Sequence, residues 1–293
     1  MVINQFNVLL NQTHQENRTI IMGILNVTLD SFSDGGKFLD QILAVKHAKQ
    51  MIDDGADIID VGGESTKPGS DPVPIETELN RVIPVIKKLI KEIPDIIISI
   101  DSMKPIVANA ALEAGAQIIN DVTGLRNSNM ISVAVKHQCP VIIMHMLGLP
   151  KTMQQEITET TYNSNCTQEI ANYLKSQTQT AITAGIKKEN IVLDPGIGFG
   201  KTVNHNLELI NNIQKFKLLG YPILIGPSRK SFIGKLTKQA LNLETIPLAT
   251  DRLEGSLASI TACALNGASI LRVHDVKETK HALIIADALR KIK

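Results

Sequence analysis

Eight short, almost continuously apolar runs recur along the chain, and stretches with helical periodicity separate them. Such runs are typical of strands in a parallel sheet that is covered on both faces, because a half-exposed strand would alternate apolar and polar residues. They span residues 20–26, 57–63, 95–101, 116–123, 140–146, 191–198, 222–228 and 268–275. Eight strand–helix repeats in a chain of 293 residues match an α/β protein with a (β/α)8 barrel, the TIM-barrel fold.

A doubly wound sheet is the competing architecture, but it normally has fewer strands and places a cofactor fingerprint after the first one. The corresponding segment here, MGILNVTLDSFSDGG, lacks that fingerprint. No linker or low-complexity segment divides the chain, so we predict a single domain over residues 1–293, with residues 1–18 as an N-terminal extension. The longest loops between a strand and the next helix are expected after the first, second and fifth runs.

The composition limits the partners. A formal net charge of +1 gives no support for a nucleic-acid partner or an anionic membrane surface. No apolar run is long enough to span a bilayer, and the first residues are too polar for a secretory signal. The cysteines Cys139, Cys166 and Cys263 are odd in number and far apart, which predicts free thiols. We therefore expect a cytoplasmic protein without membrane or nucleic-acid partners.

Almost every apolar run ends in a polar residue. In (β/α)8 barrels the carboxyl ends of the strands build the active site, so these residues should converge on one mouth. Helix capping explains a single residue of this kind but not a ring of them. The ring consists of Asn26, Glu64 to Thr66, Asp101, Asn120, Asp121, His145, Asp194, Ser228 to Lys230, Arg272, His274 and Asp275.

One part of this ring suits a planar heterocycle that carries ring N–H and amino donors. Asp101, Asn120 and Asp194 offer the carboxylate and amide oxygens that accept from such donors. Two basic members of the ring are set aside. We predict that Arg229 makes a structural ion pair and that His145 is a buried histidine without a direct catalytic role.

Another part of the ring suits an anion such as a phosphate or pyrophosphate. It consists of Asn26, Arg272 and His274, with the loop 31–36 nearby, and arginine pairs with phosphate oxygens in a bidentate manner. A Mg²⁺ ion bound to that anion would keep several waters and need few protein ligands, so Asn26 could suffice as its ligand. The sequence has no His and Cys cluster that would indicate zinc.

The segment LDPGIGFGKT, residues 193–202, is rich in glycine but is not a nucleotide-binding loop. Pro195 stands where a P-loop requires its first glycine, and the dinucleotide spacing is not met either. We interpret the segment as the sixth strand and its exit loop, with Asp194 directed into the mouth. Lys201 and Thr202 are predicted to form the solvated start of the next helix.

Seven segments with this order and placement are similar to the dihydropteroate synthases, the folate-pathway enzymes that sulfonamides target. The resemblance runs from about Met22 to Asp275 and is carried by MGILNVTLDSFSDGG, GADIIDVGGESTKPGS, SIDSMKP, INDVTG, MHMLGLPKTMQ, LDPGIGFGKT with GPSRKSFIG, and LRVHDV. It implies a transferase that condenses 7,8-dihydropterin-6-ylmethyl diphosphate with p-aminobenzoate, giving 7,8-dihydropteroate and pyrophosphate. It also implies Mg²⁺ as cofactor and a homodimer formed by outer helices.

The resemblance assigns roles to individual residues. The pterin is held by Asp101, Asn120, Met144, Asp194 and Lys230. Catalysis is assigned to Asp101, Asp194, Lys230 and Arg272. The pyrophosphate is bound by Asn26, Arg272 and His274, and the metal ion by Asn26. The aminobenzoate site is formed by Thr66, Lys67, Pro68, Phe199 and Ser228.

Two residues depart from the family pattern. Leu29 stands where the first loop usually has proline, which should loosen that loop slightly. Lys67 stands where arginine is usual in the second loop, so we expect weaker anion binding there, because lysine lacks the bidentate fork. The second-loop segment GESTKPGS has no insertion of the kind found in resistant homologues, so we expect sensitivity to sulfonamides.

Two other functions fit a pterin-binding barrel. Methyltetrahydrofolate-binding methyltransferases share the barrel but have no need of the SRK segment or of Arg272 and His274 as an anion pair. A non-catalytic pterin-binding paralogue should have lost the first two loops or the anion ligands, and both are intact here. We therefore favour the synthase.

Overall fold

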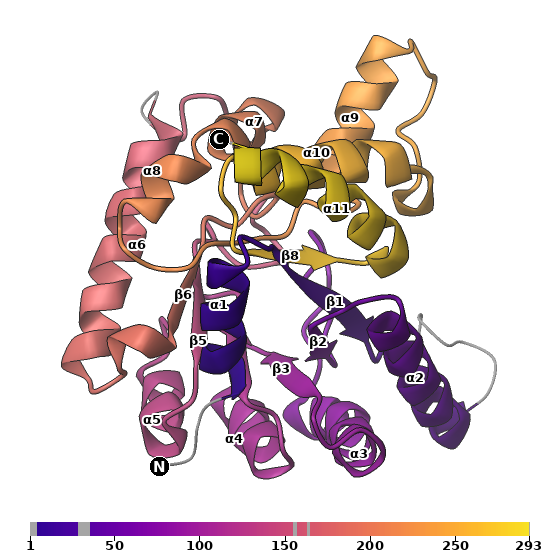
Figure 1. The fold of residues 1–293 in the computed structure, drawn as a ribbon, viewed down its shortest axis with the longest axis vertical. Helices are drawn as coiled ribbons and strands as arrows, with labels where there is room; N and C mark the ends of the chain where they lie inside the picture. The colour runs from indigo at the N-terminus through magenta and orange to yellow at the C-terminus, as the bar shows by residue number, and fades with distance from the viewer. Residues whose placement is uncertain (1–4, 29–35, 155–156, 163–164, 293) are drawn as a thin grey trace.

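The computed structural model describes residues 5–28, 36–154, 157–162 and 165–292. Its strands form a nearly closed parallel barrel with helices around it (Figure 1), so the predicted (β/α)8 fold is confirmed. The strands are β1 (Ile20–Asn26), β2 (Ile58–Gly62), β3 (Ile97–Asp101), β4 (Ile118–Asp121), β5 (Val141–Met144), β6 (Ile191–Asp194), β7 (Leu224–Ile225) and β8 (Ile270–Val273).

One helix follows each of the first five strands and β8, whereas two helices follow β6 and two follow β7. A further helix, α1, precedes the barrel. The helices are α1 (Gln5–Gln15), α2 (Gly36–Asp53), α3 (Ile75–Glu92), α4 (Pro105–Glu113), α5 (Ser128–His137), α6 (Cys166–Thr183), α7 (Val203–Asn211), α8 (Ile213–Lys217), α9 (Ser231–Ala240), α10 (Leu253–Leu265) and α11 (Val276–Ile292). Within the described ranges, none of them combines the length and apolarity that a bilayer span requires.

The sheet has the order β6-β5-β4-β3-β2-β1-β8-β7, and neighbouring strands are parallel. A parallel bridge joins Leu193 of β6 to Ile223, just before β7. The N–H of Leu193 also donates to the carbonyl of Pro222 at 3.0 Å. These contacts close the barrel.

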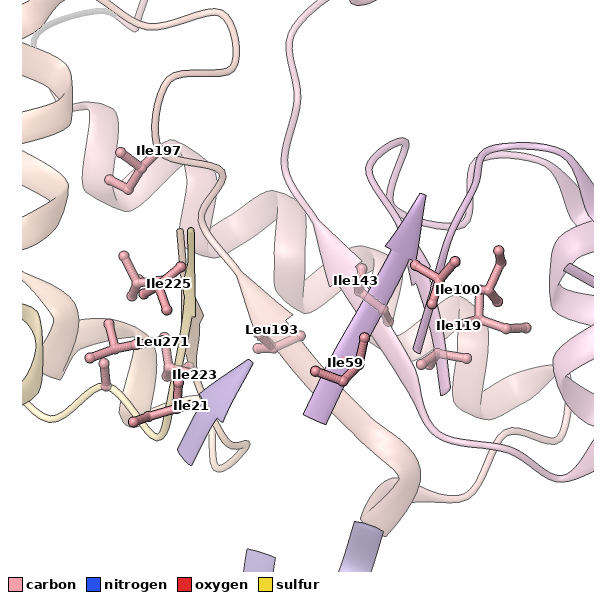
Figure 2. Close-up of a cluster of buried hydrophobic side chains, with 14 of the residues drawn as sticks. Ile21, Ile59, Ile100, Ile119, Ile143, Leu193, Ile197, Ile223, Ile225 and Leu271 are labelled. Carbon is pink, nitrogen blue, oxygen red and sulfur yellow. The ribbon is translucent and has the colours of Figure 1, made fainter. Parts of the chain in front are cut away.

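Strand residues that point outward pack against the helices and form the larger hydrophobic core. Figure 2 shows members of this core from every strand: Ile21, Ile59, Ile100, Ile119, Ile143, Leu193, Ile225 and Leu271. Because successive side chains of a strand point to opposite faces, the residues on either side of each of these point into the barrel.

A second core fills the amino-terminal end of the barrel. Inward-facing residues such as Met22, Ile58 and Ile97 pack there with Phe6 of α1. Asn7 of the same helix donates from Nδ2 to Oδ1 of Asn190, directly before β6, at 3.0 Å. The helix α1 therefore covers this end of the barrel.

The strands are shorter than most of the predicted runs. The runs 191–198 and 222–228 contain strands of only four and two residues, because the glycine and polar residues at their ends belong to loops. The predicted long loops after the first, second and fifth strands are confirmed. Leu29 and residues 31–35 of the first loop lie outside the described residues.

Candidate active site

The polar residues at the carboxyl end of the barrel share the register of the inner core. In β2 Asp60 follows Ile58 by two positions, and in β6 Asp194 follows Val192 by two. Residues two apart in a strand point to the same face, so both carboxylates point into the barrel, one layer above the inner core. Even spacing from inner-core residues of their own strands also points Asn26, Asp101, Asn120, Met144 and Arg272 into the barrel above that core.

Arg272 lies at the centre of this polar layer. Its Nε donates to Oδ2 of Asp60 at 2.6 Å, and its Nη2 donates to Oδ2 of Asp101 at 2.5 Å. Asp60 Oδ2 also accepts from Nδ2 of Asn120 at 3.0 Å. Asp60 is fully buried, and sequence reasoning missed it because only the ends of the apolar runs were considered. A charged residue in the middle of a buried strand requires a polar partner, so the position of Asp60 within an apolar run was the signal that could have identified it.

Two carboxylates retain acceptor capacity in this layer. Oδ1 of Asp101 is buried and has no hydrogen-bond partner among the described residues. Asp194 Oδ1 accepts from the N–H of Gly196 at 2.7 Å, the one hydrogen bond that the described part of the chain gives to this carboxylate. Burial raises the pKa of Asp101 to about 7 and that of Asp194 to about 6. Near neutral pH both can accept from ligand N–H groups.

Lys230 lies against an apolar wall of the mouth. Its Nζ lies 4.0 Å from the centroid of the Phe199 ring, a cation–π contact. Its stem passes over Gly198, where an added Cβ would come within 2.9 Å of the Cδ of Lys230. Burial and the charge of Arg272 lower the pKa of Lys230 to about 8. The wall consists of Val122, Met144, Met146, Met153 and Phe199, with Met103 packed against it.

His274 pairs with Ser228 next to these cations. The Ser228 Oγ accepts from the N–H of His274 at 3.2 Å and lies 3.0 Å from its Nδ1. The hydroxyl proton can therefore be donated to Nδ1, which leaves Nε2–H as a donor toward a ligand. Burial lowers the pKa of His274 to about 3, so the ring is neutral. The cations that lower it further are Lys67, Arg229, Lys230 and Arg272, a set that suits an anion.

Asn26 ends β1 beside Gly62. A Cβ at Gly62 would lie 3.8 Å from Oδ1 of Asn26 and 3.7 Å from Oδ2 of Asp101, so the glycine leaves room between these two oxygens. The described residues contain no cluster of three His, Cys, Asp or Glu side chains that could hold a metal ion alone. Hard oxygen donors beside a cationic cluster fit Mg²⁺ that enters together with a phosphate ligand.

Residues 22–274 match the sequence pattern of a protein family described as "Pterin binding enzyme". The chain belongs to this family. It is 49% identical over 274 residues to the dihydropteroate synthase of Clostridium beijerinckii, covering 93% of this chain and 94% of the relative. Within the family it therefore groups with the dihydropteroate synthases, as its sequence motifs predicted.

Solved dihydropteroate synthases have the same fold. The enzyme of Clostridium difficile, crystallised in the presence of pteroic acid, is 48% identical and aligns with a TM-score of 0.83 over 93% of this chain and 97% of that one. The enzyme of Xanthomonas albilineans with 4-aminobenzoic acid is 39% identical, with a TM-score of 0.85 over 95% of each chain.

The predicted aminobenzoate residues of this dihydropteroate synthase homologue lie in two places. Phe199 and Ser228 are buried beside Lys230 and His274, as described above. Thr66, Lys67 and Pro68 lie at the rim, where Lys67 and Pro68 are exposed. The second loop contacts the fifth loop, because the N–H of Gly69 donates to the carbonyl of Pro150 at 3.0 Å.

Three predictions about basic residues near the mouth can be compared with the structure. Arg229 pairs with Asp275 at 2.5 Å, which confirms the predicted structural ion pair. His145 is buried against the rings of Tyr162 and Tyr173, as predicted. The prediction for Lys201 is wrong, because this residue is only 3% exposed. Its amine points inward to buried acceptors, which are the carbonyl oxygen of Phe199 in the same loop and two atoms of His145 after β5.

Proposed function

We propose that the chain is a dihydropteroate synthase that joins 7,8-dihydropterin-6-ylmethyl diphosphate to p-aminobenzoate, giving 7,8-dihydropteroate and pyrophosphate in folate biosynthesis. The observation that carries this proposal is the pairing of inward acceptors with a cationic cluster in one mouth. Asp101 and Asp194 provide the acceptors, and Lys230 and Arg272 belong to the cations. The relatives solved with pteroic acid and with 4-aminobenzoic acid support the choice of substrates.

Catalysis of this reaction depends on stabilising the departure of the leaving group. The bond between the pterin methylene carbon and the diphosphate oxygen breaks, and pyrophosphate leaves with the electron pair. The amine lone pair of aminobenzoate forms the new C–N bond, and the nitrogen then loses a proton. Electrostatics and positioning carry most of this catalysis, so no covalent nucleophile is required.

The chain's charges match this sequence of events. The neutral His274 donor and its surrounding cations neutralise the departing pyrophosphate. Asp101 and Asp194 accept from the pterin ring and stabilise the cationic character that develops on its methylene carbon. Phe199 and Met144 belong to the apolar wall, which excludes the water that would otherwise trap this cation.

We propose Mg²⁺ as the cofactor, with Asn26 as its protein ligand. The ion supplies charge neutralisation to the diphosphate when it binds. The amide oxygen of Asn26 lies near the Asp101 carboxylate across Gly62, on the side where a diphosphate would meet Arg272.

Pyrophosphate release by the purified protein tests the function. Release should require both p-aminobenzoate and Mg²⁺, stop when a chelator removes the metal ion, and be inhibited by a sulfonamide at concentrations comparable to aminobenzoate. Binding of the pterin diphosphate without any release of pyrophosphate would instead identify a non-catalytic pterin-binding paralogue.

The pKa values of three buried groups predict a bell-shaped pH dependence of kcat/KM. Below pH values of about 7 and then 6, Asp101 and Asp194 bind protons and lose acceptor capacity. Above about pH 8, Lys230 loses its charge. We expect the maximum between pH 7 and 8, with about a tenfold loss per pH unit above pH 8 and between pH 7 and 6, and about a hundredfold loss per unit below pH 6, where both carboxylates are protonated. Lys230→Arg should extend the alkaline limb, because a guanidinium stays protonated; a flat profile from about pH 5 to 9 would contradict the assignments.

Replacing Lys67 by arginine should strengthen binding at the second loop. The side chain is exposed at the rim, and a guanidinium can grip a carboxylate with two parallel hydrogen bonds. We expect the KM for aminobenzoate to fall about threefold to tenfold while kcat changes less than about twofold. Lys151→Arg is the matched control. This exposed lysine lies in the fifth loop and pairs at 2.7 Å with Asp71, a residue of the second loop. Equal KM values for Lys67→Arg and its parent would refute the idea.

We also propose a homodimer formed by outer helices. On α11 the apolar residues Ile285, Leu289 and Ile292 recur at helical spacing and are 63%, 48% and 84% exposed. An apolar stripe on one helix face favours association with a second copy, and light scattering measures the outcome. The cysteines are free and buried, which is compatible with the proposed cytoplasmic location.

A further inference from the structure

Lys201 is a buried lysine that the reaction described above does not use. It directly precedes Thr202, the N-cap of α7, and its amine points back to the loop 195–200. Its Nζ lies 2.9 Å from the carbonyl oxygen of Phe199, 3.1 Å from Nδ1 of His145 and 3.4 Å from the carbonyl oxygen of His145. No carboxylate within the described residues forms an ion pair with it.

The number of donors matches the number of acceptors. An ammonium group has three N–H donors, and these three oxygen and nitrogen atoms are its acceptors. The imidazole Nδ1 can accept only if the ring is neutral. Burial lowers the pKa of His145 to about 2, which ensures this state. Burial also lowers the pKa of Lys201 to about 7, so the ammonium is held in the interior at a cost in free energy.

Both acceptor residues belong to segments that shape the mouth. His145 directly follows β5, and its N–H donates to the carbonyl of Asp194 at 2.9 Å. Its own carbonyl approaches Gly196 so closely that a Cβ there would lie 1.9 Å away. Phe199 carries the ring that faces the Lys230 ammonium. Lys201 thus joins the end of β5 to the loop after β6 at the residue whose ring borders the site.

We propose that Lys201 is a positioning residue of the aminobenzoate site, whose ammonium holds the Phe199 backbone against the end of β5 and thereby sets the Phe199 ring. This inference rests on the proposed function, since Phe199 borders the aminobenzoate there. The pterin acceptors Asp101 and Asn120 lie on other strands. The carboxylate of the third acceptor, Asp194, is held by the N–H of Gly196 and makes no hydrogen bond with Lys201. The geometry of the pterin acceptors therefore does not depend directly on the Lys201 contact.

Steady-state kinetics of Lys201→Met test the proposal, because methionine keeps an unbranched side chain only one atom shorter and removes all three donors. A displacement of about 1 Å at a substrate-contacting group costs on the order of tenfold to a hundredfold. We expect the KM for aminobenzoate to rise at least about tenfold, while the KM for the pterin diphosphate and kcat change less than about threefold. Lys201→Gln, which keeps two amide donors, should recover part of the loss.

Tyr162→Phe is the matched control. It removes one buried hydrogen bond, from Oη to the carbonyl of Gly200 at 2.9 Å, in the same loop but not at Phe199. Its aminobenzoate KM should stay within about twofold of the parent. An unchanged aminobenzoate KM in a folded Lys201→Met or Lys201→Gln protein would overturn the proposal, as would an equal rise of both KM values or an equal effect of Tyr162→Phe. If the parent itself releases no pyrophosphate, the proposed function fails before any variant is compared.

Discussion

Changing Asp194 to asparagine should lower kcat/KM for the pterin diphosphate by about 10³-fold, which corresponds to about 4 kcal/mol. The N–H of Gly196 donates to Oδ1 of Asp194 at 2.7 Å, so an asparagine would place its amide oxygen there. Its Nδ2 would then point into the mouth, where the ligand's own N–H donors require an acceptor. Two donors that face each other in a buried site leave both unpaired, and such mismatches discriminate strongly. Asp194→Ala should lose at least as much.

A second buried aspartate provides the control for this experiment. Asp287 lies on α11 at the opposite end of the barrel and accepts from the N–H and the hydroxyl of Thr19 at 3.0 and 2.7 Å. Asp287→Asn should lower the melting temperature while kcat/KM stays within about twofold of the parent. If Asp194→Asn also keeps parental kcat/KM, the carboxylate does not bind the pterin. The assignment of the site would then have to be abandoned.

The barrel could be predicted from the sequence because the eight apolar runs are separated by stretches of helical length. The positions at which the strands end could not be predicted from the sequence. The run 222–228 reads as one strand, yet the strand β7 contains only Leu224 and Ile225, and Ile223 adds a single bridge to Leu193. The glycine, proline and serine that follow are apolar or small enough to extend the pattern without extending the sheet. Hydrogen bonding to a neighbouring strand decides this boundary, and the local sequence does not record it.

The site was predictable to the extent that strand ends define it. Asp101 and Asp194 end their strands, and both point into the mouth. Asp60 lies two residues before the end of β2, so a search for strand ends passed over it, although strand parity would have found it. Lys201 could not be placed in this way. Its burial depends on acceptors of His145, 56 positions away in the sequence, and a lysine beside a glycine loop otherwise reads as solvated.

Asp60→Asn should lower kcat/KM by about 10²-fold and move the acid limb of its pH profile downward. One oxygen of Asp60 accepts from both Arg272, at 2.6 Å, and Asn120, at 3.0 Å, so the carboxylate fixes the two side chains together. Removing the charge of one partner in a buried ion pair costs about 3 kcal/mol or more when the other charge stays. Arg272 retains Asp101 as a partner, which is why we expect a loss smaller than for Asp194.

The shift of the acid limb separates an electrostatic role of Asp60 from a merely structural one. The pKa of Asp101 is raised by burial, lowered by Arg272 and raised again by the negative charge of Asp60. Without that charge the pKa of Asp101 falls, and the limb should move from about pH 7 toward pH 6, where Asp194 becomes limiting. Ser99→Ala is the control, because Ser99 lies opposite Asp60 on β3 and its buried hydroxyl has no partner among the described residues. That variant should keep the parental profile; a loss of stability in Asp60→Asn with an unmoved limb would show that Asp60 only supports the fold.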